Sequence, residues 1–134
     1  ILNPTLDDML QNNLYRLTVR GRTYFVPLWH SEAYFDGDDG EIIVKCLPSL
    51  PVNVYIDEAN AIHIDITRKF SVDYFDDRRL AFHIGSSRFE IPKLHFQKTK
   101  TYHLENQGLS HINAHDVCEV DKKSGIYVTL TFID

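Results

Sequence analysis

The histidines are the residues of this chain that most directly suggest chemistry. The 134 residues include seven histidines, and His111 and His115 stand four positions apart with Asp116 directly after them. On a helix such a pair would share one face, as zinc ligands often do. The segment is rich in glycine and small polar residues and has no helical apolar stripe. We therefore expect loop histidines and no metal site. His63 and His83 lie in alternating stretches, where a solvated or hydrogen-bonded histidine is the expected state.

The acidic segment from Asp36 to Glu41 reads D-G-D-D-G-E and is the second candidate metal site. Alternating carboxylates are typical of calcium loops, but this segment lacks the glycine at the sixth place and the distal glutamate of a twelve-residue loop. We expect a tight turn between two strands.

No pattern for nucleophilic or cofactor chemistry is present. The chain has no Gly-x-Ser-x-Gly elbow and six glycines in all, and no phosphate-cradling loop can be recognised. The neighbouring carboxylates Asp57 and Glu58 lie at turn-like positions, where they are solvated by default. We expect a protein that is not an enzyme and that needs no cofactor and no metal.

Charge and cysteine content exclude further classes of function. Fourteen Lys and Arg stand against nineteen Asp and Glu, so the net charge is −5 and the pI is near 5.7, which disfavours binding to nucleic acid or anionic membrane. Cys46 and Cys118 are the two cysteines, and both lie among apolar neighbours. They do not form a disulfide framework, which favours a reducing, cytoplasmic location. No apolar run is long enough to span a membrane.

Alternation of apolar and polar residues predicts many short strands. In 61–67 the three isoleucines fall on one face, and 126–132 alternates in the same way. The run 41–47 is more continuously apolar and predicts a more deeply buried strand. Further strands are expected at 14–20, 23–29, 53–57, 79–84, 88–91, 101–104 and 116–120. A short helix is expected near residues 6–11 after the capping hydroxyl of Thr5, and a similar turn after Ser71.

An internal repeat organises these elements. A shift of 65 positions places 17–27 over 82–92 without a gap, so that Leu17 meets Phe82 and Pro27 meets Pro92. Downstream, 41–47 resembles 125–131, which requires an insertion in the second copy around 105–120. Two unrelated hairpins could align this well by chance. The alternative is a duplicated unit of one short helix and a small sheet, which predicts two β-subdomains joined near the prolines of 48–51, with Leu47, Leu50 and Val52 packed at the junction.

The hairpin expected at 14–29 carries large apolar side chains on both faces. Such a sheet is either covered on both sides or offers one face to a partner. The second alternative predicts a groove for an extended peptide, held by main-chain pairing and side-chain pockets. The residues expected to line an exposed apolar strip are Leu17, Val19, Tyr24 and Val26, followed by Tyr15 and Phe25 if the register differs by one.

Five motifs follow one another in a recognisable order. The chain reads D-G-E-I-I-V-K-C-L-P-S-L-P over 39–51 and I-D-E-A-N-A-I-H-I-D-I over 56–66, and three further motifs follow. This order resembles the substrate-binding carboxy-terminal region of DnaJ-type co-chaperones. Residues 39–51 and 56–66 are similar to the family's Gly-Asp-Leu strand, its proline-containing link and the segment that opens its second subdomain. Residues 84–88, 106–110 and 124–126 are similar to the hairpin, the Gly-x-Gly-Met-Pro turn and the final strand of that subdomain. The family's two similar subdomains would also explain the repeat.

The resemblance implies an all-β protein of two tandem small β-sandwich-like subdomains with one or two short helices. The first, shortened subdomain would span 1–50 and the second 51–134. The resemblance further implies that the chain is a module that binds hydrophobic segments of unfolded client polypeptides. The family's ATP-driven heat-shock partner chaperone would be engaged through a J-domain, whose His-Pro-Asp signature this chain lacks, as it lacks the zinc module and the dimerising helix. The alternative is a structural or assembly protein, such as a particle-shell component, that reuses the β scaffold.

Overall fold

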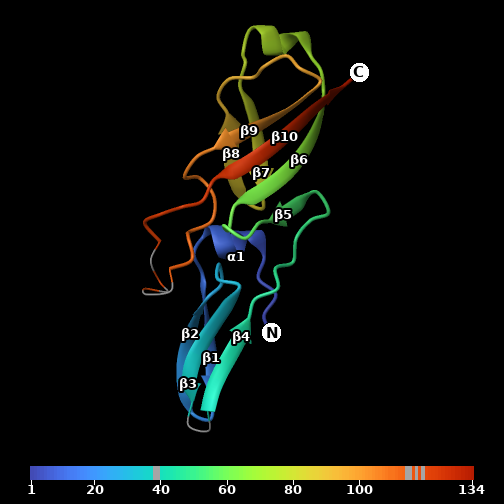
Figure 1. Ribbon diagram of the computed structural model, residues 1–134. Helices are drawn as coiled ribbons and strands as arrows, with labels where there is room; N and C mark the ends of the chain where they lie inside the picture. Colours follow the sequence, from blue (N-terminus) through green and yellow to red (C-terminus); the bar gives the residue numbers. More distant parts are fainter. Residues whose placement is uncertain (38–39, 114–115, 117, 119) are drawn as a thin grey trace.

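A computed structural model describes residues 1–37, 40–113, 116, 118 and 120–134, and shows an all-β protein (Figure 1). Within these ranges the helical elements are α1 (Leu6–Leu10) and the 3₁₀ turn η1 (Val72–Phe75). The strands are β1 (Leu14–Val19), β2 (Arg22–Pro27), β3 (Glu32–Gly37), β4 (Gly40–Lys45), β5 (Val54–Ile56), β6 (Ile62–Lys69), β7 (Leu80–Ile84), β8 (Ser87–Ile91), β9 (Thr99–Leu104) and β10 (Ile126–Ile133). None of the helices in the described ranges is long and apolar enough to cross a membrane.

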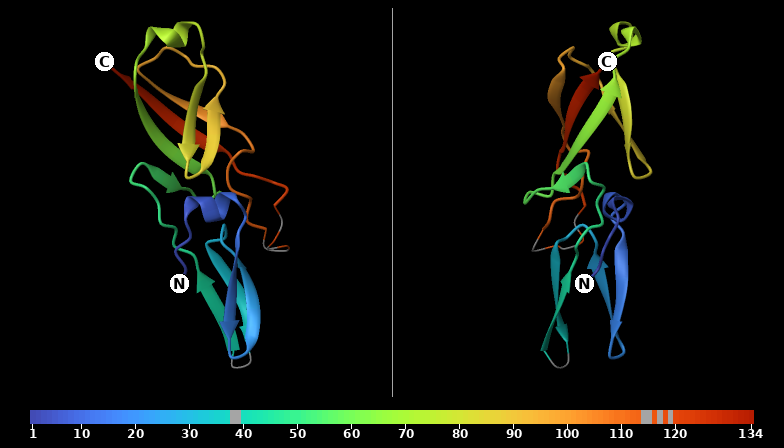
Figure 2. Two further views of the ribbon diagram at one scale, coloured as in Figure 1. Left: turned by 180° about the vertical axis from the view of Figure 1, so that it is seen from behind. Right: turned by 90° about the vertical axis from the view of Figure 1, so that its right-hand side faces the viewer.

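Two facing hairpins form the amino-terminal end of the elongated molecule (Figure 2). β1 pairs antiparallel with β2, and β3 with β4. The β1–β2 turn places Arg20 and Gly21 at φ 51° and 82°, the two left-handed positions that a two-residue hairpin turn requires. The β3–β4 strands pair up to Gly37 and Gly40. This pairing agrees with the turn expected for the acidic segment, whose two central residues lie outside the described ranges.

The carboxy-terminal end is a four-stranded sheet covered by a hairpin. The sheet order is β5-β6-β10-β9, with β6 and β10 parallel and the other pairs antiparallel. The β7–β8 hairpin packs its alternate side chains, including Phe82 and Ile91, against the inner face of this sheet. The isoleucines of β6 point inward and His63 and Asp65 point outward, which confirms the alternation expected there.

The structure contains two hydrophobic cores. The smaller lies between the two hairpins, with Val26, Leu28, Ala33, Val44 and Cys46 buried. The larger fills the carboxy-terminal sandwich. It also includes Leu6 and Met9 of α1 and Trp29. The first helix therefore packs on the larger core, midway between the two ends of the molecule, a region that we call the waist. The strands thus divide near residue 50, whereas the packing of α1 crosses that boundary.

The internal repeat has a structural counterpart. Thr5 caps α1 by accepting from the Asp8 amide, and Ser71 caps η1 by accepting from the Asp73 amide. Each cap precedes a two-stranded hairpin, β1–β2 or β7–β8, and then a second antiparallel pair, β3–β4 or β9–β10. The insertion expected in the second copy is the connection 105–125 between β9 and β10.

The structure differs in three elements from what the sequence predicted. The first is β3, which was not expected. β4 is not deeply buried, because only its inner face meets the small core, while Ile43 on the outer face is 52% exposed. The described residues of the strand expected at 116–120, namely Asp116, Cys118 and Val120, are not in a strand; Val117 and Glu119 lie outside the described ranges.

The junction between the two ends is less packed than expected. Leu50 packs against the larger core, as expected. Leu47 is 54% exposed and Val52 is fully exposed, so the expected packing of these two side chains is wrong. Both lie beside the prolines of the connecting segment, which runs along the surface rather than through the core.

Candidate functional site

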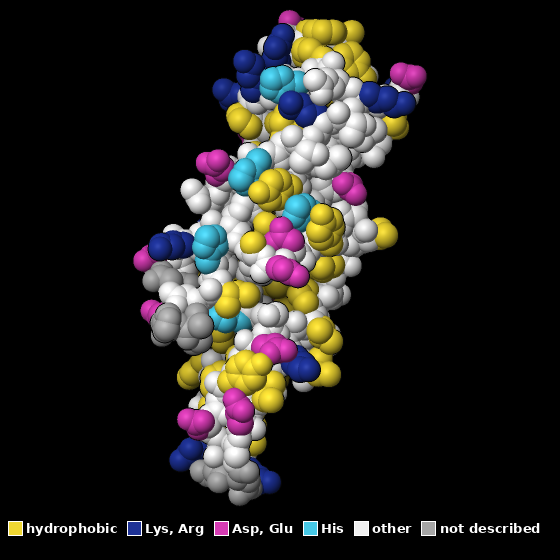
Figure 3. Space-filling model, viewed as in Figure 1, with side chains coloured by type: hydrophobic (Ala, Val, Ile, Leu, Met, Phe, Trp, Pro, Cys, Tyr) yellow, Lys and Arg dark blue, Asp and Glu magenta, His cyan; other side chains and the backbone are white. Residues whose placement is uncertain are grey.

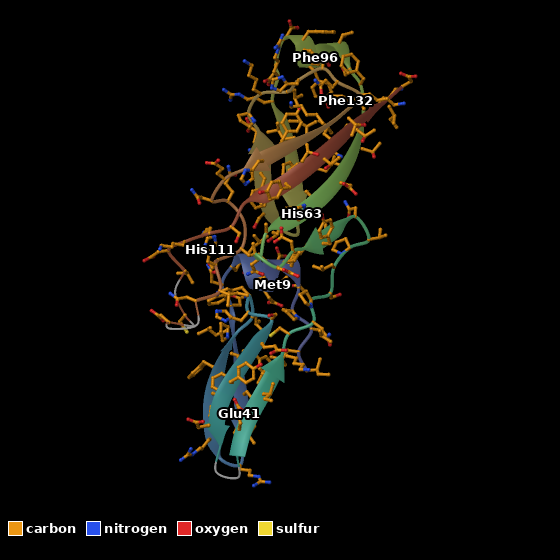
Figure 4. All side chains as sticks on the ribbon, viewed as in Figure 1. Met9, Glu41, His63, Phe96, His111 and Phe132 are labelled. Carbon is orange, nitrogen blue, oxygen red and sulfur yellow. The ribbon has the colours of Figure 1, made fainter. Side chains whose placement is uncertain are left out.

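An open cleft lies between the tips of the two amino-terminal hairpins. It has a volume of about 190 Å³ and is lined by Val19, Arg20, Arg22, Tyr24, Gly37, Gly40, Glu41 and Ile42. Figure 4 shows Glu41 at this end of the molecule. Pockets for small ligands usually measure about 300–1,000 Å³, so this cleft suits single side chains of a longer ligand.

The cleft takes its apolar wall from the inner faces of both hairpins. Leu17 and Tyr24 are register partners on the inner face of β1–β2. Phe35 and Ile42 are register partners on the inner face of β3–β4. These side chains are half-buried, because they lie between the small core and the open tips.

A contact between the two hairpins holds the cleft in shape. The ring centroids of Tyr24 and Phe35 are 5.2 Å apart at a tilted angle, and the Tyr24 hydroxyl donates a hydrogen bond to the carbonyl of Asp36 at 3.1 Å. The ring contact and the hydrogen bond tie β2 to β3. A tilted aromatic pair of this kind contributes about 0.5–1.5 kcal/mol beyond burial of its area.

The structure distributes the six residues expected to line a strip over three environments. Val19 and Tyr24 line the cleft, and Leu17 lies below them against the small core. Val26 has no exposed surface, so it cannot lie on an exposed strip as expected. It shares a face with the other three residues but sits at the base of the hairpin, where the core is closed.

The two residues named for a shifted register are exposed but do not form one surface. Tyr15 is 44% exposed on the inner face, opposite Val26. Phe25 is 55% exposed on the outer face, beside Arg16. The β1–β2 hairpin is therefore covered on one face and open on the other.

The rim of the cleft offers backbone as well as side chains. Each hairpin has two strands, so each strand has an edge that no second strand covers in the described part of the chain. At the base of the β3–β4 hairpin, away from the cleft, Leu2 covers the β4 edge by a parallel bridge to Cys46, with its amide donating to the Lys45 carbonyl at 2.8 Å. Edges that remain exposed accept an added extended strand.

The outer face of the β3–β4 hairpin carries a second exposed apolar pair, Tyr34 and Ile43, which are register partners. The Tyr34 hydroxyl donates to the Glu32 carboxylate, and this contact raises the pKa of Tyr34. Sequence reasoning missed β3, and with it Phe35 as the ring that packs on Tyr24 and Ile42 as a cleft residue. The signal that could have revealed β3 was the stretch that precedes the acidic turn and pairs with the run 41–47.

The histidines do not converge. His63, labelled in Figure 4, lies on the outer face of the large sheet in one rung of stacked rings, Tyr55–His63–Tyr127–His103, with neighbouring centroids 4.3, 4.8 and 4.3 Å apart. His111 lies in the 105–125 connection, and His115 is outside the described residues. Among the residues that the structure describes, no three His, Cys, Asp or Glu side chains are placed to hold a metal ion.

Comparisons with known proteins give no family for this chain. No protein-family model matches it, and a search of curated proteins finds no match.

Proposed function

We propose that this chain is a binding module for hydrophobic segments of unfolded polypeptides, of the kind found in co-chaperones. The observation that carries the proposal is the tip cleft, in which Val19 and Ile42 from facing hairpins meet at an open mouth. An unfolded segment presents alternate apolar side chains and unpaired backbone groups. The cleft and the hairpin edges offer a partner for each.

The size and composition of the cleft favour weak and varied recognition. It holds one or two side chains, and its apolar wall makes few directional contacts. The backbone edges add sequence-independent hydrogen bonds. A client would therefore be held through a short extended stretch, with little dependence on its sequence.

The resemblance to DnaJ-type co-chaperones supports the same function. In this proposal the ATP-driven partner chaperone is engaged by a J-domain that is not in this chain. The protein acts in the cytoplasm, which is supported by two cysteines that are both free, one of them buried. Neither nucleic acid nor a membrane is a partner.

The test is peptide binding by variants of the cleft. Val19→Thr combined with Ile42→Thr changes two apolar lining residues to polar residues of similar shape that also favour strands. We expect the Kd for a fluorescent extended peptide with alternating leucines to rise by about tenfold, because roughly 1.4 kcal/mol of apolar burial is lost.

The matched control is Phe25→Thr, which removes a larger exposed apolar side chain from the outer face of the same hairpin. It should leave the Kd unchanged. Equal affinity of wild type and the cleft variant, or an equal loss in the control, would remove the cleft as the client site. If the control alone abolished self-association of the protein, the assembly alternative would be favoured.

A further inference from the structure

A larger hollow lies at the opposite end of the molecule. It has a volume of about 610 Å³ and is walled by Phe70, Phe96 and Phe132, with Lys98 and Asp134 beside them. Figure 4 shows Phe96 and Phe132 close together at this end, far from the tip cleft. The three phenylalanines come from the end of β6, the segment before β9, and β10.

The aromatic side chains are already packed in the free protein. Phe70 makes edge-on contacts with Phe75, Phe96 and Phe132, at centroid distances of 5.7, 6.0 and 5.4 Å. Phe75 and Phe96 are 4.8 Å apart. Rings held in this way lose little side-chain freedom when a ligand binds.

Backbone hydrogen bonds hold the walls of the hollow in place. The Phe70 amide donates to the Ile133 carbonyl at 2.9 Å, and the Phe132 amide donates to the Lys98 carbonyl at 2.8 Å. Phe132 is nearly buried, whereas Phe75 is 56% exposed and Phe96 37% exposed. The hollow therefore has a rigid floor and an accessible aromatic rim.

Positive charge surrounds this rim although the chain as a whole is acidic. Outside the β7–β8 hairpin, whose turn lies at α1, residues 68–79 and 92–100 contain seven Lys and Arg and three Asp and Glu, against fourteen and nineteen in the whole chain. The Arg78 guanidinium lies 5.0 Å from the centre of the Phe96 ring. Lys98 lines the hollow, and Figure 3 shows Lys and Arg gathered around the apolar end.

These cations are not neutralised by ion pairs within the described residues. Among the described residues of this half of the chain, the ion pairs are His63 with Asp57 and Arg79 and Arg88 with Glu90. None of these pairs involves Arg78 or Lys98. The acidic residues at this end are Asp73, Asp76 and Asp77 of η1 and its flank, together with Asp134. One of them, Asp77, caps the Arg79 amide at 3.2 Å.

We propose that this aromatic hollow binds an extended acidic segment of a partner protein that carries large apolar side chains. The apolar side chains enter between Phe70, Phe96 and Phe132. Carboxylates at alternate positions meet Arg78 and Lys98 on the rim. The site differs from the tip cleft, because its ligand is selected by charge as well as by apolar surface.

The test compares three fluorescent peptides in which leucine alternates with aspartate, serine or lysine. We expect the aspartate peptide to bind at least about tenfold more tightly than the serine peptide at low salt and the lysine peptide to bind most weakly, with the difference falling as salt rises. Arg78→Gln with Lys98→Gln should remove most of the preference for aspartate. Equal affinity for the three peptides, or an unchanged preference in that variant, would overturn the proposal.

A second pair of variants separates this site from the tip cleft and from self-association. Phe75→Ser removes an exposed ring that packs against Phe96 and should weaken binding of the aspartate peptide by about threefold or more, whereas Val19→Thr with Ile42→Thr should not affect it. The reverse pattern would overturn the proposal. So would a concentration-dependent oligomer that Phe75→Ser disperses and that excludes the peptide, because the hollow would then bind a second copy of the chain.

Discussion

The side-chain amide of Asn60 lies 3.0 Å from the backbone carbonyl of Trp29, a residue of the amino-terminal half. The same amide donates at 3.0 Å to the carbonyl of Ser110 in the 105–125 connection. Asn60 is nearly buried and has a left-handed φ of 64°. A single asparagine therefore joins three segments at the waist, where α1 also packs.

We predict that Asn60→Ala lowers the free energy of unfolding by about 2–4 kcal/mol, because two buried carbonyls lose their donor and alanine tolerates a left-handed backbone less well than asparagine. Asn60→Gly removes the same hydrogen bonds but suits the left-handed backbone. It should cost about 1 kcal/mol less than the alanine variant in urea unfolding. Equal stability of wild type and both variants would show that the waist contact does not couple the halves.

Stability should depend on the ionisation of Asp57. The His63 ring is hydrogen-bonded to its carboxylate at 2.8 Å, and this contact, with the amides of Ala61 and Ala59, lowers the pKa of Asp57 below its ordinary value of 3.8. Because the folded pKa is lower than the unfolded one, the carboxylate adds stability above pH 3.8 and loses that contribution as the pH falls through the folded pKa.

Asp57→Asn removes the charge and keeps an oxygen that accepts from the backbone amides. The difference in unfolding free energy between wild type and this variant should stay below about 1 kcal/mol, because solvent screens a carboxylate that is a third exposed. This difference should shrink on acidification. Asp65→Asn, on the face of β6 that carries His63, serves as the control. A difference that stays constant across the acid range would contradict the assignment.

The connecting segment supplies a matched test of packing. Leu50→Ser should lower the free energy of unfolding by roughly 1–3 kcal/mol, because Leu50 packs against the larger core. Leu47→Ser should have no measurable effect, since that side chain is largely exposed. Denaturant midpoints measure both, and equal midpoints for wild type and Leu50→Ser would mean that the segment is a solvated tether.

Metal removal should leave the protein unchanged. Neither the acidic turn before β4 nor the histidines of the 105–125 connection have the ligand spacing of a closed site. The melting temperature should therefore be the same with and without EDTA. A loss of several degrees on adding the chelator would reveal a site.

Alternation along the sequence predicted which face of a strand is buried but not how deeply. Val19 and Val26 share the inner face of one hairpin, yet the first lies at the open tip and the second in the closed core. How deeply a side chain of a hairpin is buried depends on which part of it the facing hairpin covers. The facing strand β3 was not recognised, because Tyr34 and Phe35 are apolar residues on opposite faces and break the alternation.

The aromatic hollow had no local signal in the sequence. Its walls come from Phe70, Phe96 and Phe132, which are far apart along the chain and meet because β6 runs parallel to β10. A parallel pair requires a long crossover, here the segment that contains η1, β7, β8 and β9. β6, β9 and β10 could be predicted from the sequence, whereas this pairing and the hollow it creates could not.

The central claim is that the tip cleft holds apolar polypeptide segments, and mapping the bound peptide by nuclear magnetic resonance tests it most directly. Titration of isotope-labelled protein with an extended peptide of alternating leucine and serine should shift the amide signals of Val19, Tyr24 and Ile42 first. The Val19→Thr and Ile42→Thr variant should lose those shifts. Shifts confined to the outer face around Phe25, or the same shifts in the variant, would contradict the claim.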